Sequence, residues 1–428
     1  MCSYSEQDYK LALEESFNFS SFKSEEQKIA TECIASEKYK NIIISMATQS
    51  GKSLCYQLPR TALQRSGVVL VISPNISLIT NQVAYLSDLR IPVTSLTGIT
   101  PRLVRRDLID RLEDSKANPY QFLYLTPEML IKGSESIRFL IETMMADGDI
   151  SLIVMDDAHM IIDTGIEFRH CFSEMRNIRK MFPDIPWVAL TTASLESIKM
   201  IGIALNMEDP KIIKGPSTRK NIFYDVRKFP VNSSIKELIE DLIESDEKQE
   251  KHVTKKIYDS GIIYCHMNQE ADRIAEELCE SGISSESFYG TKNECNLILK
   301  NWKDGKFPVL VATEQSFGLG INRNPLKYVV HMTSPKNLRA FYQQSGRIDT
   351  SPGYSRLVYP PNGFVTKEMK EYATHTGCRH QYIANFFGDE ENEPCGNNCD
   401  NCVTKERLDR KGKSSDGSKS LEVKRKSF

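Results

Sequence analysis

The chain has 428 residues, of which 40% are hydrophobic and 26% charged, and its net charge is −2. It is too long for one hydrophobic core, so we expect two or three globular domains. The near-neutral charge excludes a protein that attracts polyanions over its whole surface, and any nucleic-acid site must be a local patch. No apolar run approaches the ~20 residues of a membrane span, and the N-terminus lacks the pattern of a signal peptide.

Apolar runs of strand length alternate with helical patterns along the chain. The first set of predicted strands is Asn41–Ser45, Val68–Ile72, Phe122–Leu125, Leu152–Met155 and Trp187–Thr191. The second set is Ile222–Val226, Gly261–Cys265, Val309–Ala312, Tyr328–Met332 and Ser355–Tyr359. Helical patterns such as Ala271–Cys279 and Leu297–Lys303 separate them. This alternation predicts the α/β class with two parallel sheets, and the break between them is expected near Lys214–Ser217.

The segment Met46–Ser53 ends in Gly-Lys-Ser, with a strand-like run before it and a helix-like run, Leu54–Leu58, after it. In this setting backbone N–H groups and the helix N-terminus bind phosphates. Lys52 is expected to reach the β- and γ-phosphates of a nucleotide, and the Ser53 hydroxyl to ligate Mg²⁺. The alternative is a chance Gly-Lys-Ser on a surface turn. The predicted phosphate-binding residues are Thr48, Gln49, Ser50, Gly51, Lys52 and Ser53.

A fully apolar strand, Ser151–Met155, ends in Asp156-Asp157-Ala158-His159. A buried parallel strand with a carboxylate at its C-terminal end is where an NTPase holds Mg²⁺. Asp156 is the candidate metal ligand and Asp157 the candidate base that orients the attacking water. Either motif alone is weak, but the ordered pair predicts a chain that binds a nucleoside triphosphate.

Most of the eleven cysteines are scattered through strand- and helix-like segments, which favours a reducing compartment over a disulfide framework. Four others have the spacing C-x16-C-x3-C-x2-C, at Cys378, Cys395, Cys399 and Cys402. Four thiolates complete a tetrahedral shell for structural Zn²⁺. The nearby His375 and His380 are therefore expected to be bystanders. Four unrelated cysteines are the alternative.

Read in chain order, eight blocks resemble motifs I, Ia, Ib, II, III, IV, V and VI of the RecQ family of DNA helicases, within helicase superfamily 2. The blocks are Met46–Pro59, Val71–Leu78, Tyr124–Glu128, Asp156–His159, Leu190–Ala193, Gly261–Cys265, Val311–Ile321 and Tyr342–Arg347. The resemblance covers roughly residues 10–402. It implies two RecA-like lobes with ATP in the cleft between them, followed by a four-cysteine zinc subdomain.

The expected domains are a first lobe at residues 1–215, a second lobe at 216–366, a zinc-binding subdomain at 367–405 and a basic disordered tail at 406–428. The family's winged-helix domain has no room after the cysteines, so weaker duplex-end recognition is expected. The resemblance assigns Arg347 to the catalytic group and Gln27 to the nucleotide-binding residues. It implies DNA contacts from Phe168, Arg169, Ser73, Thr126 and Thr313.

This chain departs from the family pattern mainly at residues expected to take part in ATP binding and hydrolysis. Asp157 stands where the family has Glu, which shortens the base by about one methylene, and a ~1 Å misplacement can cost ~100-fold. Thr350 stands at the arginine-finger position, and losing a finger costs roughly 10³–10⁵ in rate. Gln49 replaces a glycine of the loop. The adenine-recognition motif is imitated by Phe22-Lys23, but its glutamine register holds Glu26, with Gln27 one residue late.

The aromatic-rich loop after motif II departs as well, with Thr164, Ile166 and His170 in place of Trp, His and Pro. Two functions therefore stay open. The first is an ATP-dependent helicase that moves 3′ to 5′ on DNA, acting in repair or recombination in the nucleus. The second is a hydrolysis-impaired module that binds ATP and DNA, or a partner, without productive turnover. A translocase of another superfamily 2 type, acting on RNA, is a weaker third. We expect single-stranded or partial-duplex DNA as partner, no membrane, and a monomer or weak oligomer; protein partners are not indicated.

Overall fold

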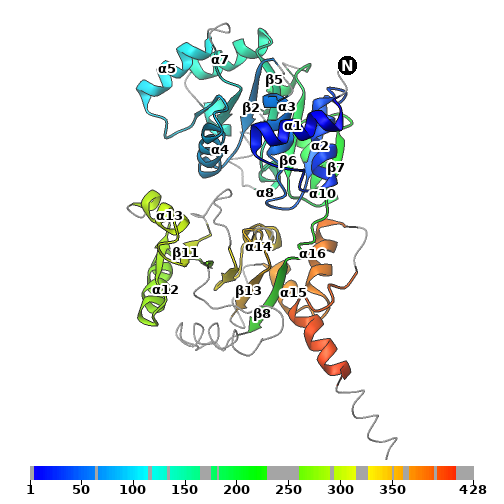
Figure 1. Cartoon of the computed structure of the whole chain (residues 1–428), viewed down its shortest axis with the longest axis vertical. Coiled ribbons are helices and arrows are strands. Elements are labelled where there is room, and N and C mark those ends of the chain that lie inside the picture. Colours follow the sequence, from blue (N-terminus) through cyan, green and yellow to red (C-terminus); the bar gives the residue numbers. More distant parts are fainter. Residues whose placement is uncertain are drawn as a thin grey trace, which may run out of the picture. The chain divides into compact units, whose positions relative to one another are not determined.

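The computed structural model describes residues 4–62, 66–113, 118–132, 135–163, 175–180, 183–228, 260–289, 294–314, 326–348, 351–359, 366–389 and 393–410. The chain divides into two compact units between Pro216 and Ser217, and each carries one parallel sheet (Figure 1). Within the described residues, no helix has the length and apolar character that crossing a membrane requires. The α/β class with two parallel sheets is thus confirmed.

The first unit is built on seven parallel strands in the order β3-β4-β2-β5-β6-β1-β7. Their bounds are β1 Asn41–Ser45, β2 Val68–Ile72, β3 Val93–Leu96, β4 Phe122–Leu125, β5 Ile150–Met155, β6 Trp187–Thr191 and β7 Lys211–Lys214. The five strands predicted for this half are present. The two edge strands, β3 and β7, had not been predicted.

Helices cover both faces of this sheet, and alternate side chains of each strand separate into two cores. On β1, Ile43 belongs to a core that also contains residues of α5 (Arg102–Glu113), α7 (Glu135–Ala146) and α10 (Leu195–Ala204). Its neighbours Ile42 and Ile44 pack on the opposite face with α1 (Glu6–Phe17), α2 (Glu25–Ala35), α3 (Leu54–Ala62) and α4 (Ile76–Asp88). This two-residue period is that of a strand buried on both sides. Two short helices, α6 (Pro127–Lys132) and α8 (Met160–Asp163), follow β4 and β5.

The second unit has six parallel strands in the order β10-β11-β9-β12-β13-β8. Their bounds are β8 Ile222–Lys228, β9 Gly261–Cys265, β10 Ser285–Phe288, β11 Val309–Thr313, β12 Tyr328–His331 and β13 Gly353–Tyr359. The helices are α12 Asn268–Glu280, α13 Cys295–Lys303, α14 Leu338–Ser345, α15 Lys367–Thr374 and α16 Arg379–Phe387. The five strands predicted here are present, and the edge strand β10 had not been predicted.

The C-terminal segment begins in a different conformation from the one expected. Residues 400–410 are helical, and an ion pair between Arg410 and Glu406 spans one turn of this helix. The prediction that the tail is disordered from residue 406 is therefore wrong for residues 406–410. Charge pairs at i,i+4 support a helix even where it buries few apolar side chains. The rest of the predicted tail lies outside the described residues.

Candidate nucleotide and metal sites

The phosphate-binding loop lies at the carboxyl end of β1 and leads into the N-terminus of α3. Lys52 Nζ donates hydrogen bonds to the backbone oxygens of Met46 (3.0 Å) and Ala47 (2.9 Å) and lies 3.3 Å from Thr192 Oγ1. The ammonium therefore sits inside the curve of the loop, against carbonyl groups that a bound phosphate would compete with. Thr192 belongs to the predicted motif III block but had been given no role, and its hydroxyl also bonds to the Met46 carbonyl at 2.9 Å.

Gly51 adopts a left-handed conformation with φ of 82°, and a Cβ there would lie 2.3 Å from the side-chain nitrogen of Gln27. Only glycine tolerates both this backbone conformation and the closeness of Gln27. The absence of a side chain also lets the loop backbone approach a phosphate. Gln27 Nε2 donates to the Gly51 carbonyl at 2.9 Å, and its Oε1 accepts from the Lys23 N–H at 2.7 Å. Gln27 therefore reaches the phosphate-binding loop, although Glu26 stands in the family's glutamine register. The contact of Lys23 with the loop, where its Nζ lies 3.3 Å from the Gln49 carbonyl, had not been predicted.

Gln49 takes up the conformation that the expected glycine would have had. Its φ is 63°, in the left-handed region that costs a non-glycine residue about 1–2 kcal/mol. Thr48, Gln49, Ser50 and Ser53 are each half-buried. The loop therefore keeps its shape despite the substitution, at a local cost in backbone strain.

Asp156 and Asp157 follow β5 and are buried, with 6% and 8% of their surface exposed. The Asp156 N–H bonds to the Ile72 carbonyl, and the Asp157 N–H donates to Asp156 Oδ1 at 3.0 Å. Burial raises the pKa of the Asp156 carboxyl, and Lys52 opposes that rise. A carboxylate that is buried next to the loop lysine, with the Ser53 hydroxyl following that lysine, is a donor set that suits Mg²⁺. Asp157 has a φ of 48°; its role as base remains a prediction.

The residues predicted to contact DNA fall at the ends of strands or outside the described residues. Ser73 and Thr126 follow β2 and β4 at the carboxyl edge of the first sheet and are 1% and 4% exposed. Thr126 Oγ1 accepts a hydrogen bond from the Met129 N–H at the start of α6. Thr313, at the end of β11 in the second unit, is 3% exposed. Phe168 and Arg169 lie outside the described residues, as do Thr164, Ile166 and His170.

Arg347 follows α14 in the second unit and is 4% exposed. Burial raises the pKa of Tyr264, and the Arg347 guanidinium lowers it in part, so the two side chains are close neighbours. Thr350 lies outside the described residues. Arg356, on β13 and six residues after Thr350, is 4% exposed and donates to Asp225 Oδ2 at 2.7 Å. Because this pair links β13 to β8, Arg356 is a structural residue, and its replacement by alanine is expected to destabilise the second unit.

The sulfur atoms of Cys378, Cys395, Cys399 and Cys402 lie within 4.8 Å of one another. Zinc with bonds of about 2.3 Å needs sulfurs about 3.8 Å apart, so the four thiols fit a tetrahedral Zn²⁺ site. Hydrogen bonding from the Cys395 thiol lowers the pKa of Cys399 to about 5. The cluster contains neither nearby histidine. His380 lies 3.1 Å from the Asn398 carbonyl, and His375 packs on Tyr382, as expected of bystanders.

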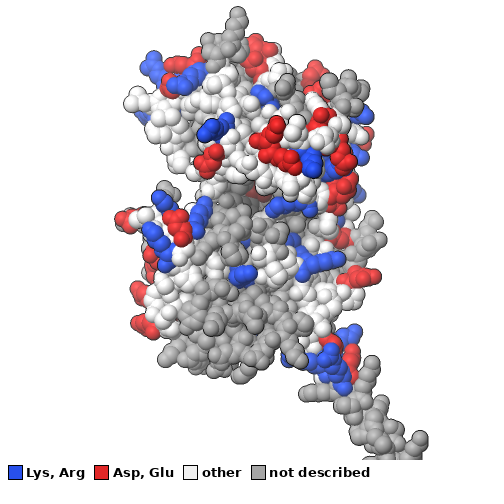
Figure 2. All heavy atoms as spheres, in the orientation of Figure 1, with Lys and Arg blue, Asp and Glu red and all other residues white. Residues whose placement is uncertain are grey.

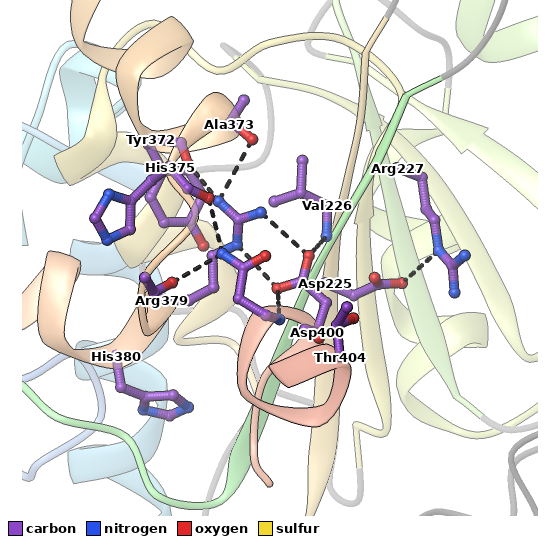
Figure 3. A network of polar contacts seen from close by, with 12 residues as sticks. Asp225, Val226, Arg227, Tyr372, Ala373, His375, Arg379, His380, Asp400 and Thr404 are labelled. Atoms are coloured by element: carbon purple, nitrogen blue, oxygen red, sulfur yellow. Dashed lines mark hydrogen bonds and ion pairs between the residues drawn. The ribbon is translucent and has the colours of Figure 1, made fainter. Parts of the chain in front are cut away.

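The zinc subdomain contacts the second sheet through Asp400, which also pairs with the buried Arg379 (Figure 3). Arg379 Nε and Nη2 donate to the two carboxylate oxygens of Asp400 at 3.0 and 3.1 Å. Asp400 also accepts the Val226 N–H of β8 at 3.0 Å. Asn398, two residues earlier, donates to the Ile222 carbonyl at 3.1 Å. These contacts satisfy polar groups of an edge strand, which would otherwise be open to pairing with another chain.

Charges of both signs are interspersed on the face of the molecule shown in Figure 2. This distribution agrees with the net charge of −2. Among the described residues visible on that face, Lys and Arg do not gather into one broad surface.

Family models match three parts of the chain: DEAD/DEAH box helicase at residues 24–201, helicase conserved C-terminal domain at 236–349, and RecQ zinc-binding at 365–403. The ATP-dependent DNA helicase Q5 of Mus musculus is 31% identical over 97% of this chain and 45% of its own length. The ATP-dependent DNA helicase Q-like 2 of Arabidopsis thaliana is 31% identical over 90% of this chain and 56% of its own length. The chain thus spans about half the length of the curated relatives it matches.

Among solved structures, the helicase Lhr of Mycobacterium smegmatis, bound to ssDNA and AMP-PNP, superimposes with a TM-score of 0.61. It is 19% identical, and the match covers 82% of this chain and 47% of that one, so it supports the fold alone. The motif order, the four-cysteine cluster and the three family models point to one assignment: the chain belongs to the RecQ family within helicase superfamily 2.

Proposed function

We propose that the protein is an ATP-dependent DNA helicase that translocates 3′ to 5′ and acts in DNA repair or recombination in the nucleus. The observation that carries the proposal is the position of Lys52, held inside the phosphate-binding loop and close enough to oppose the rise in the Asp156 pKa. A lysine and a buried carboxylate at the carboxyl edge of one parallel sheet serve phosphoryl transfer. Relatives named ATP-dependent DNA helicases support the choice of DNA.

The residues present define what the chain does with a nucleotide. The α3 N-terminus and the Gly51 backbone bind the phosphates, and Lys52 leaves the Met46 and Ala47 carbonyls to meet them. Ser53 and Asp156 would hold Mg²⁺, which would neutralise charge on the phosphate oxygens. Gln27 keeps the loop in register from α2 through its bond to Gly51. Asp157 orients the attacking water, and Arg347 is the catalytic arginine of the second unit.

DNA binds through phosphate contacts that are weakly dependent on sequence. Ser73, Thr126 and Thr313 lie at carboxyl ends of strands, and Phe168 and Arg169 complete the proposed set. Lhr, which shares this fold, was solved with ssDNA bound, and the choice of DNA for this chain rests on its helicase relatives. Contacts of this kind make log K fall linearly with log salt concentration, by close to one unit per phosphate neutralised.

Binding of ATP and DNA with impaired hydrolysis is the second candidate function, because Asp157 and Thr350 stand at the positions of the base and the arginine finger. A shortened base and a missing finger reduce turnover while leaving phosphate binding intact. In this case ATP and DNA bind and influence each other, but phosphate is released no faster than from a protein without the base.

The test is phosphate release by the pure full chain, with and without single-stranded DNA, compared with Lys52→Ala. We expect DNA-stimulated release from wild type and loss of both nucleotide binding and release in Lys52→Ala, with unchanged thermal stability. Nucleotide affinity in Lys52→Ala equal to wild type would refute the proposed site. Normal ATP binding without release identifies the second function, and Thr350→Arg combined with Asp157→Glu is then expected to raise kcat with little change in ATP affinity.

A further inference from the structure

A groove between α10 and β7 of the first unit exposes aliphatic side chains to water. Ile203, near the end of α10, is 70% exposed, and Ile212, on the edge strand β7, is 41% exposed. Both line a groove of about 510 Å³ whose walls are mainly apolar, here called the aliphatic groove, between residues 199–206 and 210–212. Contiguous apolar surface that is left open to water marks an interaction site more strongly than a single exposed side chain does.

The turn between α10 and β7 forms one wall of the aliphatic groove and is held by its own hydrogen bonds. The Met207 N–H donates to the Gly202 carbonyl at 2.9 Å, and Asn41 Nδ2 donates to the Glu208 carbonyl at 2.7 Å. Asn206 has a φ of 53°, a conformation that asparagine adopts more readily than most residues. Because this wall is already ordered, a partner that enters the groove loses little affinity to the ordering of the protein.

A second hollow, of about 730 Å³, adjoins the aliphatic groove, since Asn206 and Glu208 line both. It is here called the basic hollow, and its other walls come from residues 38–41, 179, 180, 183 and 209. The described lining of the two hollows includes two acidic side chains, Glu208 and Asp209, and six basic ones: Lys38, Lys40, Arg176, Arg179, Lys180 and Lys199. The whole chain has 55 basic and 57 acidic residues, so positive charge is concentrated at this surface.

Most of these positive charges are open to a partner. Lys38, Lys180 and Arg176 are exposed, and their side chains make no ion pair among the described residues. Lys40 contacts Asp184 at 2.7 Å, but the two side chains are 61% and 91% exposed. An exposed pair of this kind contributes little free energy, so a carboxylate of a partner can replace Asp184.

The two hollows lie at the edge of the first sheet opposite to the nucleotide site. All strands of this sheet are parallel, so their amino ends share one edge and their carboxyl ends the other. Residues 38–40 lead into β1 and residues 206–210 lead into β7, which places both hollows at the amino edge. Lys52 and Asp156 follow β1 and β5 at the carboxyl edge. A partner bound at the amino edge therefore leaves the nucleotide site accessible.

Aliphatic side chains beside a cluster of lysines and arginines suit a peptide that carries apolar and acidic residues together. An apolar side chain of the peptide fills the groove, and its carboxylates meet the basic side chains. A nucleic acid would also meet the lysines, but unpaired bases bind by stacking on aromatic rings. Among the described residues that line the aliphatic groove, none is aromatic.

We propose that the aliphatic groove and the basic hollow together form a docking surface for an acidic peptide segment of another protein. One aliphatic or aromatic side chain of the segment lies against Ile203 and Ile212, and its carboxylates lie against Lys38 and Lys180. The inference goes beyond the proposed function and does not depend on it, because none of these residues belongs to the nucleotide site.

The experiment selects short random peptides, displayed on phage, that bind the immobilised full chain. The enriched peptides are expected to combine several acidic residues with an aliphatic or aromatic one. The affinity of a fluorescent synthetic copy of an enriched peptide is then measured by anisotropy. Ile203→Ser should weaken binding by about 10-fold or more, because it removes the most exposed apolar side chain of the groove. Lys38→Glu combined with Lys180→Glu should weaken it by roughly 3- to 10-fold and reduce its dependence on salt.

Two matched controls come from other surfaces of the first unit. Leu103→Ser removes an aliphatic side chain of α5 that is 85% exposed, and Lys10→Glu reverses an exposed charge on α1. Both variants should bind the selected peptide within about 2-fold of wild type, since surface substitutions away from a binding site have small effects. Phosphate release should equal that of wild type in all four variants, which separates this test from the test of the proposed function.

Selection that enriches no acidic peptide, or a selected peptide that binds Ile203→Ser as tightly as wild type, overturns the proposal. Two other results overturn it by naming a different occupant. A single-stranded oligonucleotide that binds the Lys38→Glu, Lys180→Glu variant more weakly, while the peptide does not, assigns the basic hollow to nucleic acid. A wild-type dimer that Ile203→Ser converts to a monomer assigns the aliphatic groove to a second copy of the chain.

Discussion

Replacing Asp400 by alanine should destabilise the second unit far more than its place on a short C-terminal helix suggests. Arg379 is 4% exposed and Asp400 is 19% exposed at the side chain. The substitution leaves a buried guanidinium without its carboxylate, which costs about 3–5 kcal/mol. The partial exposure of Asp400 favours the lower end of that range. The Val226 N–H also loses its acceptor, and about 1 kcal/mol follows from that bond.

The chain offers a clean optical probe for this experiment, because its two tryptophans are divided between the units. Trp187 lies in β6 of the first unit and Trp302 in α13 of the second, and both are fully buried. A Trp187→Phe background therefore reports unfolding of the second unit alone. A loss of about 3 kcal/mol lowers Tm by roughly 6–12 °C in a unit of this size.

Glu371→Ala is the matched control in the same unit. Its carboxylate lies 3.6 Å from Lys367, and the two side chains are 56% and 90% exposed. Exposed pairs contribute less than about 1 kcal/mol, so Tm should barely move. Equal effects of Asp400→Ala and Glu371→Ala would refute the reasoning, since the buried pair would then hold nothing together.

Three further outcomes are expected. Gln49→Gly should leave stability unchanged or slightly higher, whereas Gln49→Val should lower the free energy of unfolding by about 1–2 kcal/mol, because a β-branched residue fits the φ of 63° poorly; thermal melts of both variants decide. Cys399→Ser should lose the bound Zn²⁺ that Cys265→Ser retains, as counted by elemental analysis, since only the former is in the cluster. Burial lowers the pKa of His331 from 6.5 to about 3. Between these two pH values the imidazole of His331 binds a proton in the unfolded chain but not in the folded chain. Stability should fall from pH 6.5 towards pH 3, by about 2 kcal/mol at pH 5, and His331→Gln should remove this part of the slope in urea titrations.

The strands that the sequence did not predict are all edge strands. β3, β7 and β10 lie at the ends of their sheets, and they are short strands that mix polar with apolar residues, as in Ser285-Glu-Ser-Phe288 of β10, where Glu286 is the exposed residue. A continuous apolar run identifies a strand that is buried on both faces. A strand at the edge of a sheet is less completely covered, so its sequence is less apolar and harder to recognise. β8 was predicted although it is an edge strand, because the zinc subdomain covers it.

The candidate sites were predictable to different degrees. The loop at Lys52 and the four cysteines could be predicted because each is defined by the spacing of residues close together in the sequence. The contact of Gln27 with Gly51 depends on how α2 docks against the loop, so the sequence could propose Gln27 only from the resemblance, one residue out of the family register. The engagement of Arg356 by Asp225 spans 131 residues; no local pattern indicates such a pair.

The cover on β8 has a consequence for biosynthesis. The Val226 N–H donates to the Asp400 carboxylate, which lies 174 residues further along the chain and is therefore synthesised later. At about 5–20 residues per second, a ribosome leaves this edge open for roughly 9–35 s. During that interval the nascent second sheet presents a strand that other chains can pair with. Zinc capture by the last cysteines ends the exposure, so the supply of metal during synthesis should govern the yield of soluble protein as strongly as the stability of the finished fold does.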